Sequence, residues 1–579
     1  MDEFDEFSEH SESRRPGQRF GEWVRENRII LLYGLMLIAV LFARDLWAPD
    51  EPDFAQCVRE MRERGSWVLP YLNGLPYSEK PILFYWMMKL SAVLGDLLTD
   101  GSGFRYGVAA WALRIPSVVG SIAFLLAFRK WAKRFLQVDV ADLATLILCS
   151  TPLWFWQSQF VQVDLVFSAM LAWSWLCWLA GYLLLRGHAE GCKGEHRGLF
   201  RASYLWIGLA VLAKGPLAVV LSVLLLLTFL AWQKDLKALK EISLVKGILI
   251  MMLVVLPWLA LATLKGGRGY AYDLIILQNF ERATQAWDHI KPWWMYGRYL
   301  LGDFYPWALL LPSLALFLRG SGAHRAPVVR FLVLAFLVPL LFLSWSQSKQ
   351  GKYLLLAYPY LSLLLAGMLQ PIRVEAVSAS RIRRIGGILA LGLWLPALAL
   401  VAIALFHAGG SSLQLQVAPF LGPLRLCAAV LLLGAISVTT RSLLGQGEFL
   451  VQETAATLCV LFLMGGTWGF HRLDPVKNYR RWTAEAGPLI RGRQVYFWQT
   501  IRSGAMVYTD HQMPELRSFD ELEGRLGLED RLVSMDREWG QDAWGMDSER
   551  RRGFEVILRV PAGGGEILLI RKRSAEVHP

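Results

Sequence analysis

Long apolar runs recur from about residue 29 to residue 470, separated by short polar segments. A run that lies in lipid must satisfy its own backbone hydrogen bonds, so these runs predict membrane-spanning α-helices. We expect thirteen spans, at 29–46, 112–128, 140–156, 163–185, 203–213, 217–232, 246–264, 296–318, 331–346, 353–370, 387–407, 419–438 and 451–470.

The distribution of lysine and arginine predicts the orientation, because short cytoplasmic loops are rich in these residues. Positive charges concentrate around 129–134, 186–201, 234–240 and 373–384, which places these loops in the cytoplasm. Keeping them there requires two choices. The apolar run 81–98 is expected to lie in the membrane interface, and the run 203–232 to be two short spans that meet at Lys214-Gly215-Pro216.

The resulting topology has three parts. Residues 1–28 are polar, lack the pattern of a signal peptide and are expected to be a disordered cytoplasmic N-terminus. Residues 29–470 form the membrane domain, with a long first outer loop at 44–111. Residues 471–579 are expected to be a small soluble α/β domain outside, with strands at 493–499, 504–509, 554–560 and 565–573.

Composition supports a membrane protein, since 55% of residues are hydrophobic and only 19% are charged. The net charge of +12 is explained by the cytoplasmic loops, so we expect no nucleic-acid partner. The six cysteines form no CxxC pair, which argues against a disulfide scaffold or a zinc finger. No internal repeat of the kind found in many transporters is visible.

Unusual charges cluster in the outer loops. Asp50 and Glu51 precede Pro52 at the start of a helix that is expected to lie on the membrane surface. Asp50 is either an N-cap or a carboxylate available as a general base at the bilayer surface. Glu79-Lys80-Pro81 ends a turn-rich segment, and Lys80 either reaches lipid headgroups or binds a phosphate.

Other outer positions allow the same two interpretations, as interfacial anchors or as parts of a cationic site. These residues are Lys214, Arg282, His289, Lys349, Lys352 and Tyr353. Together with Lys80 they would suit a phosphate ester of a long isoprenoid, because lysine and arginine neutralise a departing phosphate. Asp164 opens a span, where it is either solvated or buried with a partner or a role.

The segment DEPDFAQCVREMRERGSWVLPYLNGLPYSEKPILFYW, at 50–86, with AKGP at 213–216 and HIKPWWMY at 289–296, resembles the polytopic glycosyltransferases that use polyprenyl-phosphate sugars. The bacterial 4-amino-4-deoxy-L-arabinose transferases of lipid A are the nearest in pattern, and the protein O-mannosyltransferases are more distant. The resemblance extends to about residue 359. It implies a GT-C type membrane fold in the bacterial inner membrane, with the active site facing the periplasm.

The resemblance also implies residue roles. Asp50 matches the family's essential acid, and Lys80, Arg282 and Tyr353 match residues that hold the lipid phosphate, with Lys349 as a further candidate. Glu51, Asp164, Lys214 and His289 are expected to support the site. Glu79 matches a position that contributes to a metal site with a later histidine, for which His407 is the candidate here. One carboxylate and one imidazole make a sparse site, so a divalent metal stays open and no cofactor is required.

The expected reaction is transfer of a sugar from undecaprenyl phosphate to a hydroxyl or phosphate of an acceptor, with inversion. Lipid A is one acceptor, and a protein serine or threonine or a surface polysaccharide is the alternative. A lipid transporter without enzymatic activity is the competing class. Sequence alone does not separate these acceptors, because the residues singled out bind the shared phosphate and anomeric carbon.

Overall fold

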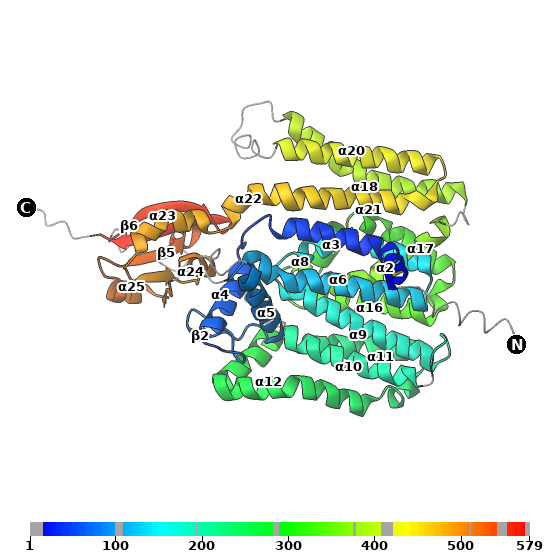
Figure 1. The fold of residues 1–579 in the computed structure, drawn as a ribbon, viewed down its shortest axis with the longest axis horizontal. Coiled ribbons are helices and arrows are strands. Elements are labelled where there is room, and N and C mark those ends of the chain that lie inside the picture. The colour runs from blue at the N-terminus through cyan, green and yellow to red at the C-terminus, as the bar shows by residue number, and fades with distance from the viewer. Residues whose placement is uncertain are drawn as a thin grey trace, which may run out of the picture.

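The computed structural model describes residues 16–98, 108–192, 194–281, 289–373, 378–406, 421–509, 511–540 and 553–573. A bundle of long helices runs roughly parallel through one part of the molecule, and a small sheet domain covers one end of it (Figure 1). Helix α4 lies between the two, which places the first outer loop at the junction of the bundle and the sheet domain (Figure 1).

The chain enters the bundle through α3 and leaves it for the first outer loop. The elements up to this point are α2 (Pro16–Glu26), α3 (Arg28–Leu41), α4 (Asp50–Glu63), β1 (Tyr71–Leu72), β2 (Leu75–Pro76) and α5 (Leu83–Leu98). Strands β1 and β2 form a small antiparallel hairpin. Helix α2 lies in the segment expected to be disordered, of which residues 1–15 fall outside the described residues.

The bundle contains most of the remaining helices. They are α6 (Ala110–Phe135), α7 (Val138–Cys149), α8 (Pro152–Ser158), α9 (Val163–Leu185), α10 (Glu195–Lys214), α11 (Leu217–Gln233), η1 (Leu236–Lys240), α12 (Leu244–Tyr272), η2 (Asp273–Glu281), α14 (Met295–Asp303), η3 (Trp307–Leu310), α15 (Leu311–Gly320), η4 (Ala323–Arg325), α16 (Pro327–Trp345), η5 (Gly351–Ala357), α17 (Tyr358–Arg373), α18 (Ala379–Phe406), α20 (Leu421–Leu443), η7 (Gly447–Phe449), α21 (Leu450–Met464), η8 (Gly465–Gly469) and α22 (Phe470–Lys477).

Every expected span overlaps one of these helices or a series of consecutive ones, although the span 29–46 extends past the end of α3 at Leu41. Within the described residues, eight helices are long and apolar enough to cross a membrane, or up to ten if the bent pairs α7–α8 and α14–α15 each count as one span. Helices α3 and α11 are apolar but shorter. The chain is therefore a multi-pass membrane protein, and the thirteen expected spans exceed the eight to ten that length and hydropathy support.

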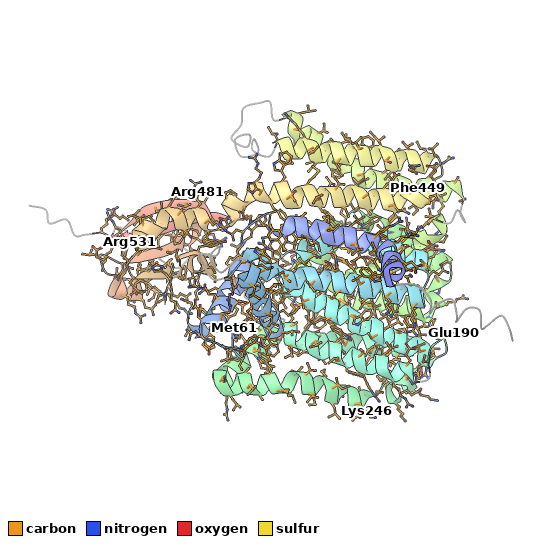
Figure 2. The ribbon with its side chains drawn as sticks, viewed as in Figure 1. Met61, Glu190, Lys246, Phe449, Arg481 and Arg531 are labelled. Carbon is orange, nitrogen blue, oxygen red and sulfur yellow. The ribbon has the colours of Figure 1, made fainter. Side chains whose placement is uncertain are left out.

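The structure confirms the break expected in one of these two runs, whereas the interfacial position of the other stays a prediction. The run 203–232 is divided between α10 and α11, with the break at Gly215 and Pro216. The run 81–98 forms α5, which is not among the candidate spans. Figure 2 places Glu190 and Lys246 at the end of the bundle remote from Arg481 and Arg531, which belong to the sheet domain.

The sheet domain is mixed, as the strand order β4-β3-β5-β7-β6 shows. Strands β4, β3 and β5 are parallel, and β5, β7 and β6 are antiparallel. Its elements are α23 (Arg480–Ile490), β3 (Val495–Trp498), α24 (Ser503–Thr509), β4 (Glu515–Leu516), α25 (Phe519–Arg525), β5 (Arg531–Met535), α26 (Asp536–Gly540), β6 (Phe554–Ala562) and β7 (Gly565–Lys572).

One predicted strand is wrong, because residues 504–509 lie in helix α24. All side chains from Ser503 to Tyr508 are buried, since α24 packs between α4 and α23. A short apolar run that is buried on every side lacks the alternation that separates strands from helices. The other three predicted strands correspond to β3, β6 and β7.

Candidate functional site

The first turn of α4 positions three carboxylates in different surroundings. Asp50, Glu51 and Asp53 all lie there, where the unpaired backbone N–H groups favour negative charge. Asp50 and Asp53 line a small cavity, whereas Glu51 is completely buried. Because adjacent positions on a helix point in different directions, one turn supplies both a structural acid and two acids of the candidate site.

Glu51 is the centre of a buried ion cluster. Its carboxylate accepts hydrogen bonds from the guanidinium groups of Arg44 and Arg114. The backbone N–H groups of Trp47 and Val161 donate to it at 2.8 and 3.0 Å. Burial alone would raise the pKa of Glu51, but the two guanidinium groups lower it to about 2. Glu51 therefore joins α4, the segment between α3 and α4, helix α6 and the loop before α9, and it holds the adjacent Asp50 in place.

Asp50 belongs to a chain of alternating charges. Lys352 Nζ donates to Asp50 Oδ2 at 2.8 Å, and Gln162 Nε2 also donates to this oxygen. The same lysine lies 3.9 Å from Asp164 Oδ2. Asp164 in turn accepts a hydrogen bond from Lys214. Residues from four separate parts of the sequence thus form one network beside the sheet domain.

The break between α10 and α11 places Lys214 in this network. Gly215 has φ +104°, a conformation that strongly favours glycine. Helix α10 therefore ends at Lys214, whose ammonium lies 4.2 Å from the centre of the Tyr353 ring. The predicted break in the span therefore places Lys214 at the candidate site.

Two cavities meet at Glu79 and Lys80, which line both of them. The first, here called the acid pocket, has a volume of about 60 Å³. Its ionisable lining consists of Asp50, Asp53, Glu79, Lys80, Asp164 and Lys352, together with the phenols Tyr77 and Tyr85.

The second, here called the lipid cavity, has a volume of about 310 Å³. Lys80, Lys214 and Tyr353 lie in its wall, and the rest of the wall includes Leu217, Val220, Phe342, Leu343 and Trp345. Trp345 is 68% exposed on the outside of the bundle. The lipid cavity therefore combines a cationic end with an apolar wall that reaches the lipid-facing surface, as a phosphate on a long hydrocarbon chain requires.

Asp50, Lys80, Asp164, Lys214, Glu79 and Tyr353 all line one or both of these cavities. Lys349 is buried elsewhere, and its ammonium donates to the Ser346 carbonyl. The side chain of His289 is exposed, and its carbonyl accepts a hydrogen bond from the Lys349 N–H at 3.0 Å. Neither residue lines the two cavities. Arg282 and His407 lie outside the described residues.

Two residues of the candidate site were given no specific role from the sequence. Lys352 was one of the outer residues expected to be either an anchor or part of a cationic site, and the structure shows that it bridges Asp50 and Asp164. Asp53 was not considered, and acidic residues are common in the first turn of a helix. The signal for Lys352 was its position immediately before Tyr353, but only the structure brings it to Asp50.

The residues described here contain no group of three or more histidine, cysteine, aspartate or glutamate side chains that could hold a metal ion. Glu79 Oε2 lies 3.9 Å from the ammonium of Lys80. The expectation of a metal between Glu79 and His407 stays a prediction, because His407 lies outside the described residues.

Residues 29–265 match the family described as dolichyl-phosphate-mannose-protein mannosyltransferase. An undecaprenyl phosphate-alpha-4-amino-4-deoxy-L-arabinose arabinosyl transferase of Pseudomonas aeruginosa is 33% identical over 65% of this chain and 64% of its own length. A transferase of the same description from Shewanella sediminis is 28% identical over 72% of each chain. The chain spans just under two thirds of the length of the Pseudomonas relative.

Solved structures show a similar fold. ArnT from Cupriavidus metallidurans bound to undecaprenyl phosphate matches 95% of this chain and 98% of its own, with a TM-score of 0.71 and 19% identity. The oligosaccharyltransferase AglB from Archaeoglobus fulgidus matches 89% of this chain and 70% of its own, with a TM-score of 0.53 and 10% identity. The predicted resemblance and the predicted helical membrane fold with a small C-terminal sheet domain are confirmed by these matches.

Proposed function

We propose that this chain, whose residues 29–265 match the dolichyl-phosphate-mannose-protein mannosyltransferase family, is a GT-C glycosyltransferase that transfers 4-amino-4-deoxy-L-arabinose from undecaprenyl phosphate to lipid A. The observation that carries the proposal is the meeting of the lipid cavity and the acid pocket at Lys80. A lipid-linked sugar that places its phosphate there has its chain against the apolar wall and its sugar beside Asp50.

The donor's phosphate binds at the cationic end of the lipid cavity. Lys80 and Lys214 supply positive charge, and the Tyr353 hydroxyl is a hydrogen-bond donor. These groups stabilise the negative charge that develops on the leaving phosphate. Arg282 is proposed to assist them, as the family resemblance implies.

Asp50 acts on the acceptor. An acceptor oxygen attacks the anomeric carbon from the face opposite the phosphate, and its proton passes to Asp50. The bond between the anomeric carbon and the phosphate oxygen breaks, and polyprenyl phosphate leaves with the electron pair. The configuration is inverted. Lys352 and Gln162 hold Asp50 in one orientation through hydrogen bonds to Oδ2.

The proposed location is the bacterial inner membrane, with the site on the periplasmic face. The loops rich in lysine and arginine support this orientation, since they are predicted to be cytoplasmic. A lipid A acceptor and a lipid-linked donor would then meet in the same leaflet, beside the sheet domain.

The test uses the purified full chain with undecaprenyl-phosphate aminoarabinose and lipid A. Wild type should release undecaprenyl phosphate and add the mass of one aminoarabinose to lipid A, while Asp50→Asn should lose transfer at least 100-fold and still bind the donor. Glu63→Gln, which changes an exposed acid at the far end of α4, is the matched control. Full activity of Asp50→Asn would remove Asp50 from this role.

The same assay separates the alternatives. Sugar found on a periplasmic protein in cells, with unmodified lipid A, would replace lipid A by a protein acceptor. Movement of the donor lipid across vesicles, with no release of undecaprenyl phosphate for any acceptor, would identify a transporter.

A further inference from the structure

The acid pocket contains more negative than positive charge. Asp50, Asp53, Glu79 and Asp164 contribute four carboxylates, whereas Lys80 and Lys352 contribute two ammonium groups. When Lys80 binds the donor phosphate, its positive charge is neutralised by the phosphate and no longer balances the carboxylates of the pocket. The pocket beside the sugar then has a surplus of carboxylates, and a neutral sugar would leave that surplus uncompensated.

The four carboxylates are not equivalent. Asp50 and Asp164 contact Lys352, and Asp164 is also paired with Lys214. Glu79 has a looser contact with Lys80, whose ammonium lies 3.9 Å from Oε2. Asp53 interacts with the carboxylates of Asp50 and Glu79 and with Ser503 and Arg502 of the sheet domain. The side chain of Arg502 is itself paired with Glu538. Within the part of the chain that the structure describes, Asp53 and Glu79 are therefore the two carboxylates of the pocket that are paired least closely with a lysine.

The pocket also contains an unused hydrogen-bonding group. Tyr85 is completely buried and lines the pocket, and its hydroxyl has no oxygen or nitrogen hydrogen-bond partner among the described residues, only the weakly bonding thiol of Cys57. A buried hydroxyl without a strong partner is costly, and a ligand hydroxyl or amine in the pocket would satisfy it. This observation is independent of the charge count and indicates a polar ligand.

Resting on the proposed function, we infer that Asp53 and Glu79 bind the ammonium group of the donor sugar, and that this contact makes the enzyme selective for an amino sugar. Tyr85 donates to or accepts from a hydroxyl of the same ring.

The packing of the sheet domain supports Asp53 as the main determinant. Helix α24 of the sheet domain packs on α4 and places Ser503 against Asp53. The sheet domain thereby forms part of the wall behind the sugar site.

The experiment compares two donors that differ at the amino nitrogen of the sugar. Undecaprenyl-phosphate aminoarabinose has an ammonium group, whereas its N-formyl derivative is neutral. Release of undecaprenyl phosphate gives KM and kcat for each donor with wild type, Asp53→Asn and the control Glu63→Gln. Wild type and the control should prefer the amino donor at least 10-fold in kcat/KM. Asp53→Asn should bring that preference close to 1, mainly by raising KM for the amino donor.

A second variant covers the case in which Asp53→Asn does not fold. Glu79→Gln should reduce the same preference severalfold, whereas Tyr85→Phe should raise KM for both donors equally and keep the preference. An unchanged preference in Asp53→Asn or, failing that, in Glu79→Gln would overturn the inference, as would an equal loss for both donors.

Failure of the proposed function has a different signature. A wild-type protein that releases undecaprenyl phosphate from neither donor would contradict the transferase itself, and the selectivity would fall with it. A wild type that uses both donors equally would leave the transferase intact and refute only the recognition of the amine.

Discussion

The ammonium of Lys352 lies 2.8 Å from Oδ2 of Asp50, although 302 positions separate the two residues. Lys352 belongs to η5 at the start of α17, and Asp50 belongs to the first turn of α4. The contact joins the first outer loop to the bundle at the point where the acid pocket lies. It also orients Asp50, as a base requires before an acceptor arrives.

Lys352→Met should therefore reduce transfer sharply. The variant keeps the length of the side chain and removes its charge, so Asp50 loses its orientation and Asp164 loses one neighbour. We expect kcat to fall about 100-fold with a small change in donor KM, and Lys352→Arg to recover part of the loss. Steady-state release of undecaprenyl phosphate measures both.

The two residues should also act as a unit. In the double variant Asp50→Asn, Lys352→Met, the loss of kcat should be far smaller than the product of the two single losses, because either change alone disrupts the pair. If the loss of kcat in the double variant equalled the product of the two single losses, Lys352 would not act through Asp50.

The hydropathy and charge pattern was sufficient to locate the helices of the membrane domain along the chain. Runs of apolar residues determine which segments are helices, and the lysine-rich loops indicated that the run 203–232 must break at Gly215. The run 504–509 was assigned wrongly because a fully buried segment carries no periodicity. For a short buried run, local pattern therefore does not distinguish a helix from a strand.

The site was predictable only in part. Asp50, Lys80 and Lys214 stand out because a charge beside lipid is costly and needs a reason. The roles of Glu51 and Lys352 depend on distant partners, namely Arg114 for the first and Asp50 for the second. No local feature of the sequence distinguishes an acid that organises the fold from the neighbouring acid that lines the pocket.

Glu51→Gln should destabilise the protein more than any change at Asp50. The substitution removes a charge from the buried cluster and leaves Arg44 and Arg114 uncompensated. Breaking a buried ion pair in this way costs about 3–5 kcal/mol. Thermal unfolding in detergent should show a large drop in Tm, whereas the control Glu63→Gln should stay near wild type. A Tm for Glu51→Gln equal to that of the control would show that the cluster does not support the fold.

Asp53→Asn should make the protein more stable at neutral and alkaline pH. The pKa of Asp53 is about 7 in the folded chain against an ordinary value of 3.8, so the folded state binds this proton more tightly than the unfolded state. Wild type therefore loses stability as the pH rises from about 4 to about 7, and asparagine does not. The difference should be small at pH 4 and reach roughly 2–4 kcal/mol at pH 8.

Unfolding of both proteins across this pH range measures the effect. The carboxylates of Asp50 and Glu79 and the guanidinium of Arg502 face the same group and are unchanged in the variant. A stability difference that is constant from pH 4 to pH 8 would mean that Asp53 titrates at its ordinary pKa.

Gly215→Ala should impair transfer by moving Lys214. The φ of +104° at Gly215 is strained for any residue with a side chain, and an added Cβ would lie 3.0 Å from Oδ1 of Asn279. Relief of this strain requires the end of α10 to shift, which displaces Lys214 from Asp164 and from the Tyr353 ring. We expect a loss of stability of about 1–3 kcal/mol and at least a 10-fold rise in donor KM.

Gly198→Ala is the matched control, because Gly198 lies in the same helix with open space around its Cβ position, where alanine favours the helix. Donor KM and Tm that change equally in the two variants would show that the break at Gly215 does not position the lysine.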